Sequence, residues 1–207
     1  MKAHFRVLLL WLGLGCSAFG ANAPRTIVFF GDSLTAGYGL DDPETESYPA
    51  IIQQKLEAAH LSWRAVNAGL SGETTSAGLR RVDWILRQHV DIFVLALGGN
   101  DGLRGIEPSV SAANLEAIIQ RVRAKYPDAK IVIAGLQMPP TMGEEYGHAF
   151  SAIFPAVAEK SHATLIPFLL ADVGGHSDLN QPDGIHPTAA GATKVAETVW
   201  AVLHPLL

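Results

Sequence analysis

Three side chains of the types that acyl-transfer enzymes use stand in short motifs near the two ends of the chain. Ser33 lies in Gly-Asp-Ser-Leu, and Asp183 and His186 lie in Asp-Gly-Ile-His-Pro. A serine hydroxyl becomes a nucleophile when an imidazole takes its proton and a carboxylate holds that imidazole. Asp183 stands three residues before His186, so its carboxylate can accept a hydrogen bond from Nδ1 of the ring. We predict that Ser33 is the nucleophile, His186 the general base and Asp183 its carboxylate partner.

Two further motifs supply the hydrogen-bond donors that an oxyanion needs. Gly72 lies in Ser-Gly-Glu-Thr and Asn100 lies in Gly-Gly-Asn-Asp. The backbone N–H groups of Ser33 and Gly72 and the side-chain amide of Asn100 form a predicted oxyanion hole, in which the loss of one donor typically costs about 100- to 1,000-fold in rate. Taken alone, each motif is at least as typical of a turn as of an active site, and Gly-Asp-Ser after a strand is more often a turn. Their combination indicates acyl transfer.

Short apolar segments alternate with amphipathic ones along the chain, and this order predicts where the motifs meet. The expected strands are Thr26–Phe30, Trp63–Asn67, Ile92–Leu97, Lys130–Gly135 and Thr164–Phe168. Helical patterns separate them: one from a cap at Ser47 to about His60, stripes at Leu79–Leu86 and Leu115–Val122, one at Gly147–Lys160 that Pro155 should interrupt, and one at Ala192–Leu203. Such alternation predicts an α/β fold with a doubly wound, flavodoxin-like, five-stranded parallel sheet.

All four motifs follow predicted strands at their carboxyl ends. In a doubly wound sheet those ends share one edge, and ligands bind in the crevice beyond it. We therefore expect the four motifs to face one site.

Residues 1–23 have the pattern of a secretory signal peptide: Lys2 and Arg6 flank an apolar run too short to span a membrane, and small residues follow it. We expect a secreted or periplasmic protein whose residues 24–207 form one domain. Lipidation at Cys16 is the less favoured alternative, because Gly13 replaces a bulky aliphatic residue.

The charge and composition narrow the range of partners. Without Lys2 and Arg6, 13 basic and 20 acidic side chains remain, a net charge of −7 with histidine neutral, and the two signs are interleaved along the chain. This argues against nucleic acid and anionic lipid as partners. No His, Cys, Asp and Glu set has metal-ligand spacing, so we expect neither metal nor other cofactor.

The four motifs in this order resemble those of the SGNH (GDSL) hydrolase superfamily, with Ser33, Gly72, Asn100 and His186 at its four signature positions. The run Leu97–Gly105 is similar to the secreted bacterial thioesterase I, lysophospholipase L1 and arylesterase branch. The resemblance implies a three-layer α/β/α fold without metal. It also implies hydrolysis of acyl esters and thioesters through an acyl-serine intermediate.

The segment after the fourth strand departs from the branch, which commonly carries Pro-x-Asn-Tyr-Gly there. This chain has Met138-Pro139-Pro140-Thr141-Met142-Gly143. Because methionine side chains are flexible and apolar, we expect Met138 and Met142 to contact an acyl chain. For Arg104, near Asn100, we expect a surface ion pair rather than substrate contact.

We thus expect a monomer that acts on small-molecule esters or thioesters, lysophospholipids included, of small to medium acyl length. Two alternatives stay open: a carbohydrate O-deacetylase on the same fold, and a catalytically inactive binding module.

Overall fold

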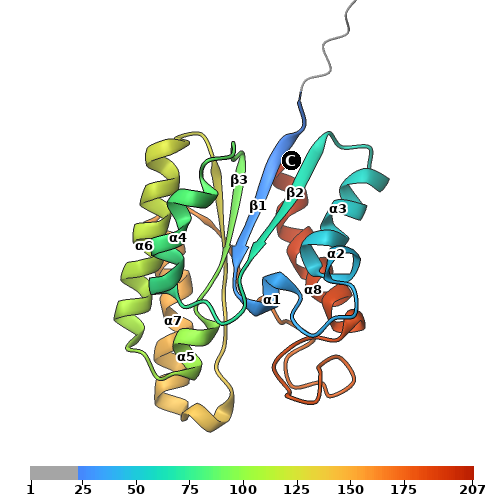
Figure 1. Cartoon of the computed structure of the whole chain (residues 1–207). Coiled ribbons are helices and arrows are strands. Elements are labelled where there is room, and N and C mark those ends of the chain that lie inside the picture. The colour runs from blue at the N-terminus through green and yellow to red at the C-terminus, as the bar shows by residue number, and fades with distance from the viewer. Residues whose placement is uncertain (1–22) are drawn as a thin grey trace, which may run out of the picture.

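The computed structural model describes residues 23–207, and the predicted signal peptide with Cys16 lies almost entirely outside this range. The elements alternate as the sequence predicts (Figure 1). The strands are β1 (Arg25–Gly31), β2 (Trp63–Gly69), β3 (Ile92–Ala96), β4 (Lys130–Ala134) and β5 (Thr164–Ile166). The helices are α1 (Ser33–Ala36), α2 (Pro43–Glu46), α3 (Tyr48–Ala58), α4 (Thr75–Ile85), α5 (Gly99–Leu103), α6 (Pro108–Lys125), η1 (Pro140–Met142), α7 (Glu144–Lys160), α8 (Ala189–Leu203) and η2 (His204–Leu206).

The five strands form one parallel sheet in the order β2-β1-β3-β4-β5, which confirms the predicted flavodoxin-like topology. Helices α3 and α8 pack together on one face, while α4, α6 and α7 cover the other, as Figure 1 shows. The three-layer α/β/α architecture is therefore confirmed. Because the strands are parallel, their carboxyl ends lie at one edge of the sheet. Strands β2, β1 and β3 are neighbours, so the motifs that follow them begin side by side at that edge.

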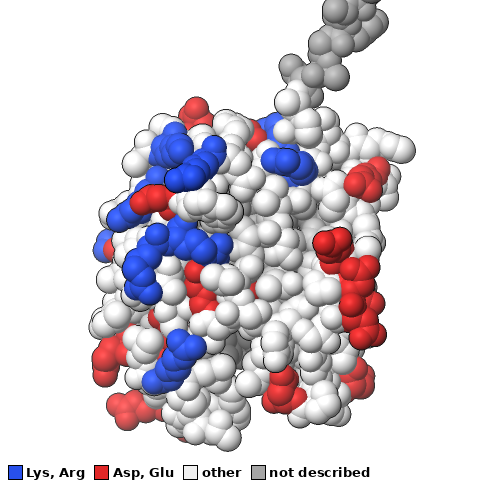
Figure 2. Space-filling view, viewed as in Figure 1, with Lys and Arg blue, Asp and Glu red and all other residues white. Residues whose placement is uncertain are grey.

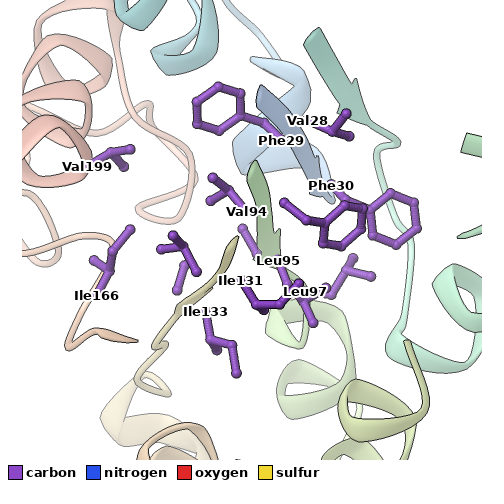
Figure 3. Close-up of a cluster of buried hydrophobic side chains, with 14 of the residues drawn as sticks. Val28, Phe29, Phe30, Val94, Leu95, Leu97, Ile131, Ile133, Ile166 and Val199 are labelled. Carbon is purple, nitrogen blue, oxygen red and sulfur yellow. The ribbon is translucent and has the colours of Figure 1, made fainter. Parts of the chain in front are cut away.

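The core consists of the side chains that the strands present to the two helical layers. Phe29 and Phe30 are neighbours on β1 and point to opposite sides of the sheet (Figure 3). Phe29 packs edge-on against Tyr48 of α3, whereas Phe30 lies beside Gly78 of α4. Because both faces are covered, β1 and β3 are buried along almost their whole length, which explains their nearly continuous apolar sequences.

Two helices differ in detail from the prediction. Helix α7 begins at Glu144 and continues through Pro155. That proline lies on the exposed side of the helix, where water can bond the carbonyl that lacks its N–H partner. Ser47 occupies the expected N-cap position of α3 but makes no capping hydrogen bond, because its Oγ instead accepts from Asn67 Nδ2 at 3.3 Å.

The fold separates the charges that the sequence interleaves. Figure 2 shows Lys and Arg side chains gathered over α4 and α6, and Asp and Glu side chains over the region of α2 and α3. Some of these cations are paired: Arg81 with Glu73, and Arg121 with Asp83. The absence of a nucleic-acid partner thus stays a prediction. Within residues 23–207, no helix is long and apolar enough to cross a membrane.

Candidate active site

Ser33 stands at the first position of α1, directly beyond the carboxyl end of β1. Asp32 caps this short helix by accepting a hydrogen bond from the N–H of Leu34 at 3.1 Å. The turn requires glycine at position 31, since a Cβ there would lie 2.0 Å from Thr35 Oγ1 and 2.8 Å from the carbonyl of Ala96. The local sequence therefore produces a tight strand-to-helix turn with the Ser33 hydroxyl at its tip.

Ser33, His186 and Asp183 form one continuous hydrogen-bonded chain, although Ser33 and His186 lie 153 positions apart in the sequence. Nε2 of His186 lies 2.9 Å from Oγ of Ser33, and Nδ1 lies 2.7 Å from Oδ2 of Asp183. The other carboxylate oxygen of Asp183 accepts from the backbone N–H groups of Ile185 and His186, at 2.9 and 3.0 Å. Asp183 thus holds both the imidazole and the loop that carries it.

The loop that carries His186 is fixed to the segment after Ser33. Nε2 of Gln181 donates to the carbonyl of Tyr38 at 2.7 Å and to that of Pro187 at 3.0 Å. The ring of Tyr38 lies 4.7 Å from that of His186, between centroids. Neither Gln181 nor Tyr38 belongs to a motif, and the sequence carries no signal that would have singled them out. Their role arises from contacts between distant parts of the chain.

The two acidic residues of the site have pKa values shifted in opposite directions. For Asp183, partial burial acts to raise the pKa, but the hydrogen bonds from His186 and Ile185 outweigh it and the pKa falls to about 2. Asp32 is 2% exposed, and burial raises its pKa to about 7 against the opposing effects of the Leu34 N–H and the charge of His186. Asp183 is therefore ionised at neutral pH, whereas Asp32 titrates close to it.

The predicted oxyanion donors lie on the segments after β1, β2 and β3. Gly72 has a φ of +80°, a conformation that favours glycine, and no heavy atom would meet a Cβ there within 4 Å. Nδ2 of Asn100 donates to the carbonyl of Glu73 at 3.1 Å. Its other contact, to Oδ2 of Asp32, is 3.5 Å long, so the amide keeps donor capacity for a substrate oxygen.

A mainly apolar cavity of about 460 Å³ is lined in part by Leu34 and Gly99, which are the sequence neighbours of Ser33 and Asn100. Its lining also includes Leu103 of α5, Met138 and Ile185. Met138 lines this cavity, and its contact with an acyl chain stays a prediction. Met142 lies in η1 and is not among the lining residues, because the chain turns away from the cavity after Pro140.

Arg104 differs from the ion pair that was expected of it. It is exposed, and its Nη2 donates to the carbonyl of Gly72 at 3.3 Å. Within the described part of the chain it forms no salt bridge. In the same part, no three His, Cys, Asp or Glu side chains gather closely enough to hold a metal ion.

The fold and the four motifs match a known enzyme family: residues 29–194 fit the model of the GDSL-like lipase/acylhydrolase family. The chain belongs to this family and is an ester hydrolase.

Several known proteins and solved structures are similar to this chain over most of its length. Esterase TesA of Pseudomonas aeruginosa is 40% identical over 186 residues, which are 89% of this chain and 90% of the relative. The thioesterase 1/protease 1/lysophospholipase L1 of Escherichia coli is 36% identical over 204 residues, 98% and 95% of the two chains. Among solved structures, the crystal structure of TesA superposes with a TM-score of 0.84 at 40% identity and covers 88% of this chain and 100% of its own. The psychrotrophic esterase EstA from Pseudoalteromonas sp., inhibited by monoethylphosphonate, reaches 0.82 at 31% identity, with 88% and 98% coverage.

Proposed function

We propose that this protein hydrolyses carboxylic esters and thioesters of small to medium acyl groups through an acyl intermediate on Ser33. The observation that carries the proposal is the hydrogen-bonded chain from Ser33 through His186 to Asp183, at 2.9 and 2.7 Å. These distances suit proton transfer from the hydroxyl to the imidazole. The relatives named esterase, thioesterase, lysophospholipase and arylesterase support the substrate class.

The reaction follows from the position of each group. Oγ of Ser33 attacks the acyl carbon while Nε2 of His186 takes its proton, and Asp183 stabilises the imidazolium. The N–H groups of Ser33 and Gly72 and the amide of Asn100 hold the carbonyl oxygen as it becomes negative. When the tetrahedral intermediate collapses, the bond to the alcohol or thiol breaks and His186 gives that leaving group its proton. A water molecule, deprotonated by His186, then attacks the acyl-Ser33 ester and releases the acid.

The cavity favours a hydrocarbon acyl chain over the acetyl group that a carbohydrate O-deacetylase would remove. Its volume of about 460 Å³ and its Leu, Met, Pro, Phe and Ile lining offer burial to a hydrocarbon chain. Each methylene buried there contributes up to about 0.8 kcal/mol, or roughly a fourfold gain in kcat/KM. p-Nitrophenyl esters should therefore improve from two to about six or eight carbons and then level off.

We infer further that the protein is exported and acts as a monomer on small-molecule substrates. The leader pattern of residues 1–23 supports export. N-terminal sequencing of protein recovered from the periplasm or medium tests this inference. An N-terminus starting at Met1 would contradict export, whereas a lipid on Cys16 would show export as an anchored lipoprotein.

Labelling with an alkyl phosphonate tests the mechanism most directly. The reagent should modify the peptide that contains Ser33 at one equivalent per chain, and Ser33→Ala should abolish both labelling and ester hydrolysis. Full activity of Ser33→Ala, or labelling at another residue, would overturn the proposal.

A further inference from the structure

Two of the proposed oxyanion donors belong to different segments, so something must fix the distance between them. Gly72 lies on the loop between β2 and α4, and Asn100 lies on α5, after β3. Gly72 itself has no side chain to anchor it, and it is exposed. The position of its N–H relative to Asn100 therefore depends on hydrogen bonds that join α5 to residues 72–75.

Three residues of α5 and its C-cap make such bonds. Nδ2 of Asn100 donates to the carbonyl of Glu73, and Nη2 of Arg104 donates to that of Gly72. Asp101 accepts from Thr75 twice, from the backbone N–H at 2.8 Å and from the hydroxyl at 2.5 Å. Helix α5 and its C-cap thus hold the segment at Gly72, Glu73 and Thr75.

The Asp101 contact is the most constrained of the three. Asp101 is 1% exposed and Thr75 is fully buried, whereas Arg104 is exposed and its bond is longer. Hydrogen bonds to a carboxylate are roughly twice as strong as neutral ones. Thr75 is also the first residue of α4, so the carboxylate meets an N–H at the positive end of that helix dipole.

The third bond of Asp101 anchors it to the scaffold. Oγ of Ser111, at the buried side of α6, donates to Oδ1 of Asp101 at 3.2 Å, and Nδ2 of Asn114 donates to the Thr75 hydroxyl at 3.0 Å. The carboxylate therefore connects α5, the start of α4 and α6. It has no contact with the Ser33–His186–Asp183 chain.

We propose that Asp101 is a positioning residue, whose carboxylate sets the separation of the Gly72 N–H and the Asn100 amide and thereby the fit of the oxyanion hole. The proposal rests on the proposed function, because it presumes that Gly72 and Asn100 bind the oxyanion. Misplacing donors costs less than deleting one, so Asp101→Ala should lower kcat about 10- to 100-fold with little change in KM.

A double-mutant cycle with Asn100→Ala tests this coupling, with p-nitrophenyl butyrate as substrate. If Asp101 acts by aligning Asn100 with Gly72, its replacement matters little once the Asn100 amide is gone. Asp101→Ala should then lower kcat less than threefold in the Asn100→Ala background. An equal fold-loss in both backgrounds, or wild-type kcat in the Asp101→Ala single variant, would overturn the proposal.

Two other variants keep the test decisive. Ser111→Ala removes the bond from Asp101 to α6 but none of the bonds to the loop, so it should lower the melting temperature and leave kcat within about twofold of wild type. Should Asp101→Ala fail to fold, Thr75→Val takes its place in the cycle. It removes the 2.5 Å bond to Asp101 and the bond from Asn114, keeps the N–H bond, and should show a smaller loss with the same dependence on Asn100.

The outcome is separable from that of the proposed function. If Ser33→Ala retains activity, the proposed function fails regardless of the cycle. If Ser33→Ala is inactive and the losses from Asp101→Ala and Asn100→Ala multiply, only the positioning role is refuted.

Discussion

Replacement of Asp183 by asparagine distinguishes a carboxylate that directs the imidazole from one that only shapes its loop. Asparagine can keep the loop intact, because its carbonyl can accept from the N–H groups of Ile185 and His186 as Oδ1 does now. Its amide nitrogen would then face Nδ1 of His186 and donate to it. The ring proton must then move to Nε2, the atom that we propose accepts the Ser33 proton in the wild type. The wrong tautomer is thereby stabilised.

The expected loss is large. The same exchange in serine protease triads lowers kcat about 10⁴-fold, equivalent to roughly 5.5 kcal/mol. The Asp183 side chain is 40% exposed, so water competes for Nδ1 and part of the population keeps the productive tautomer. We therefore expect kcat to fall about 10³- to 10⁴-fold in Asp183→Asn, with KM within about threefold of wild type.

Steady-state hydrolysis of p-nitrophenyl butyrate measures the rate, and ¹⁵N chemical shifts of the His186 ring report the tautomer. Gln181→Ala serves as the matched control, since it removes bonds that hold the loop but none to the imidazole. Its kcat should fall less than tenfold. If Asp183→Asn keeps kcat within tenfold of wild type, the tautomer argument is refuted and Asp183 only shapes the loop.

Four further outcomes are expected. Burial raises the pKa of Asp32 from 3.8 to about 7, so its contribution to the free energy of unfolding is fully present below about pH 4 and is lost as the pH rises through about 7. Urea unfolding should show this decline in wild type and not in Asp32→Asn; an equal decline in both contradicts it. Met138→Ala should flatten the gain from two- to eight-carbon esters while Met142→Ala keeps it, because only Met138 lines the cavity; equal slopes for all three proteins would exclude Met138 from the acyl site. Glu73→Ala removes the carboxylate partner of the largely buried Arg81, which keeps only its bond to the Ala68 carbonyl, and should cost about 3–5 kcal/mol in the free energy of unfolding; a loss below 1 kcal/mol is the contrary result. Dialysis against a chelator should leave esterase activity unchanged, and a loss restored by zinc would point to a metal-dependent enzyme.

Much of the fold was predictable because local chemistry dictates it. The five strands were found from short apolar segments, and their alternation with helices required parallel strands and crossovers of one hand. The short helices α1, α2 and α5 were not predicted, since four or five residues carry no helical periodicity. The continuation of α7 through Pro155 also depends on tertiary context, because the exposure of that position to water makes the proline tolerable there.

The sequence by itself determined which residue types are available for chemistry and which strand ends carry them. The motifs that contain Ser33, Gly72, Asn100 and His186 each follow a strand or precede the last helix, and the parallel sheet brings those points to one edge. Only the tertiary structure decided the contacts between these segments. Tyr38 and Gln181 support His186 only because the fold brings their segments together. In the same way, packing buries Asp32 enough to raise its pKa to about 7, and it places Asp101 of α5 beside Thr75. Sequence periodicity reports the environment along one element, whereas hydrogen-bond partners and desolvation are set by the elements packed around it.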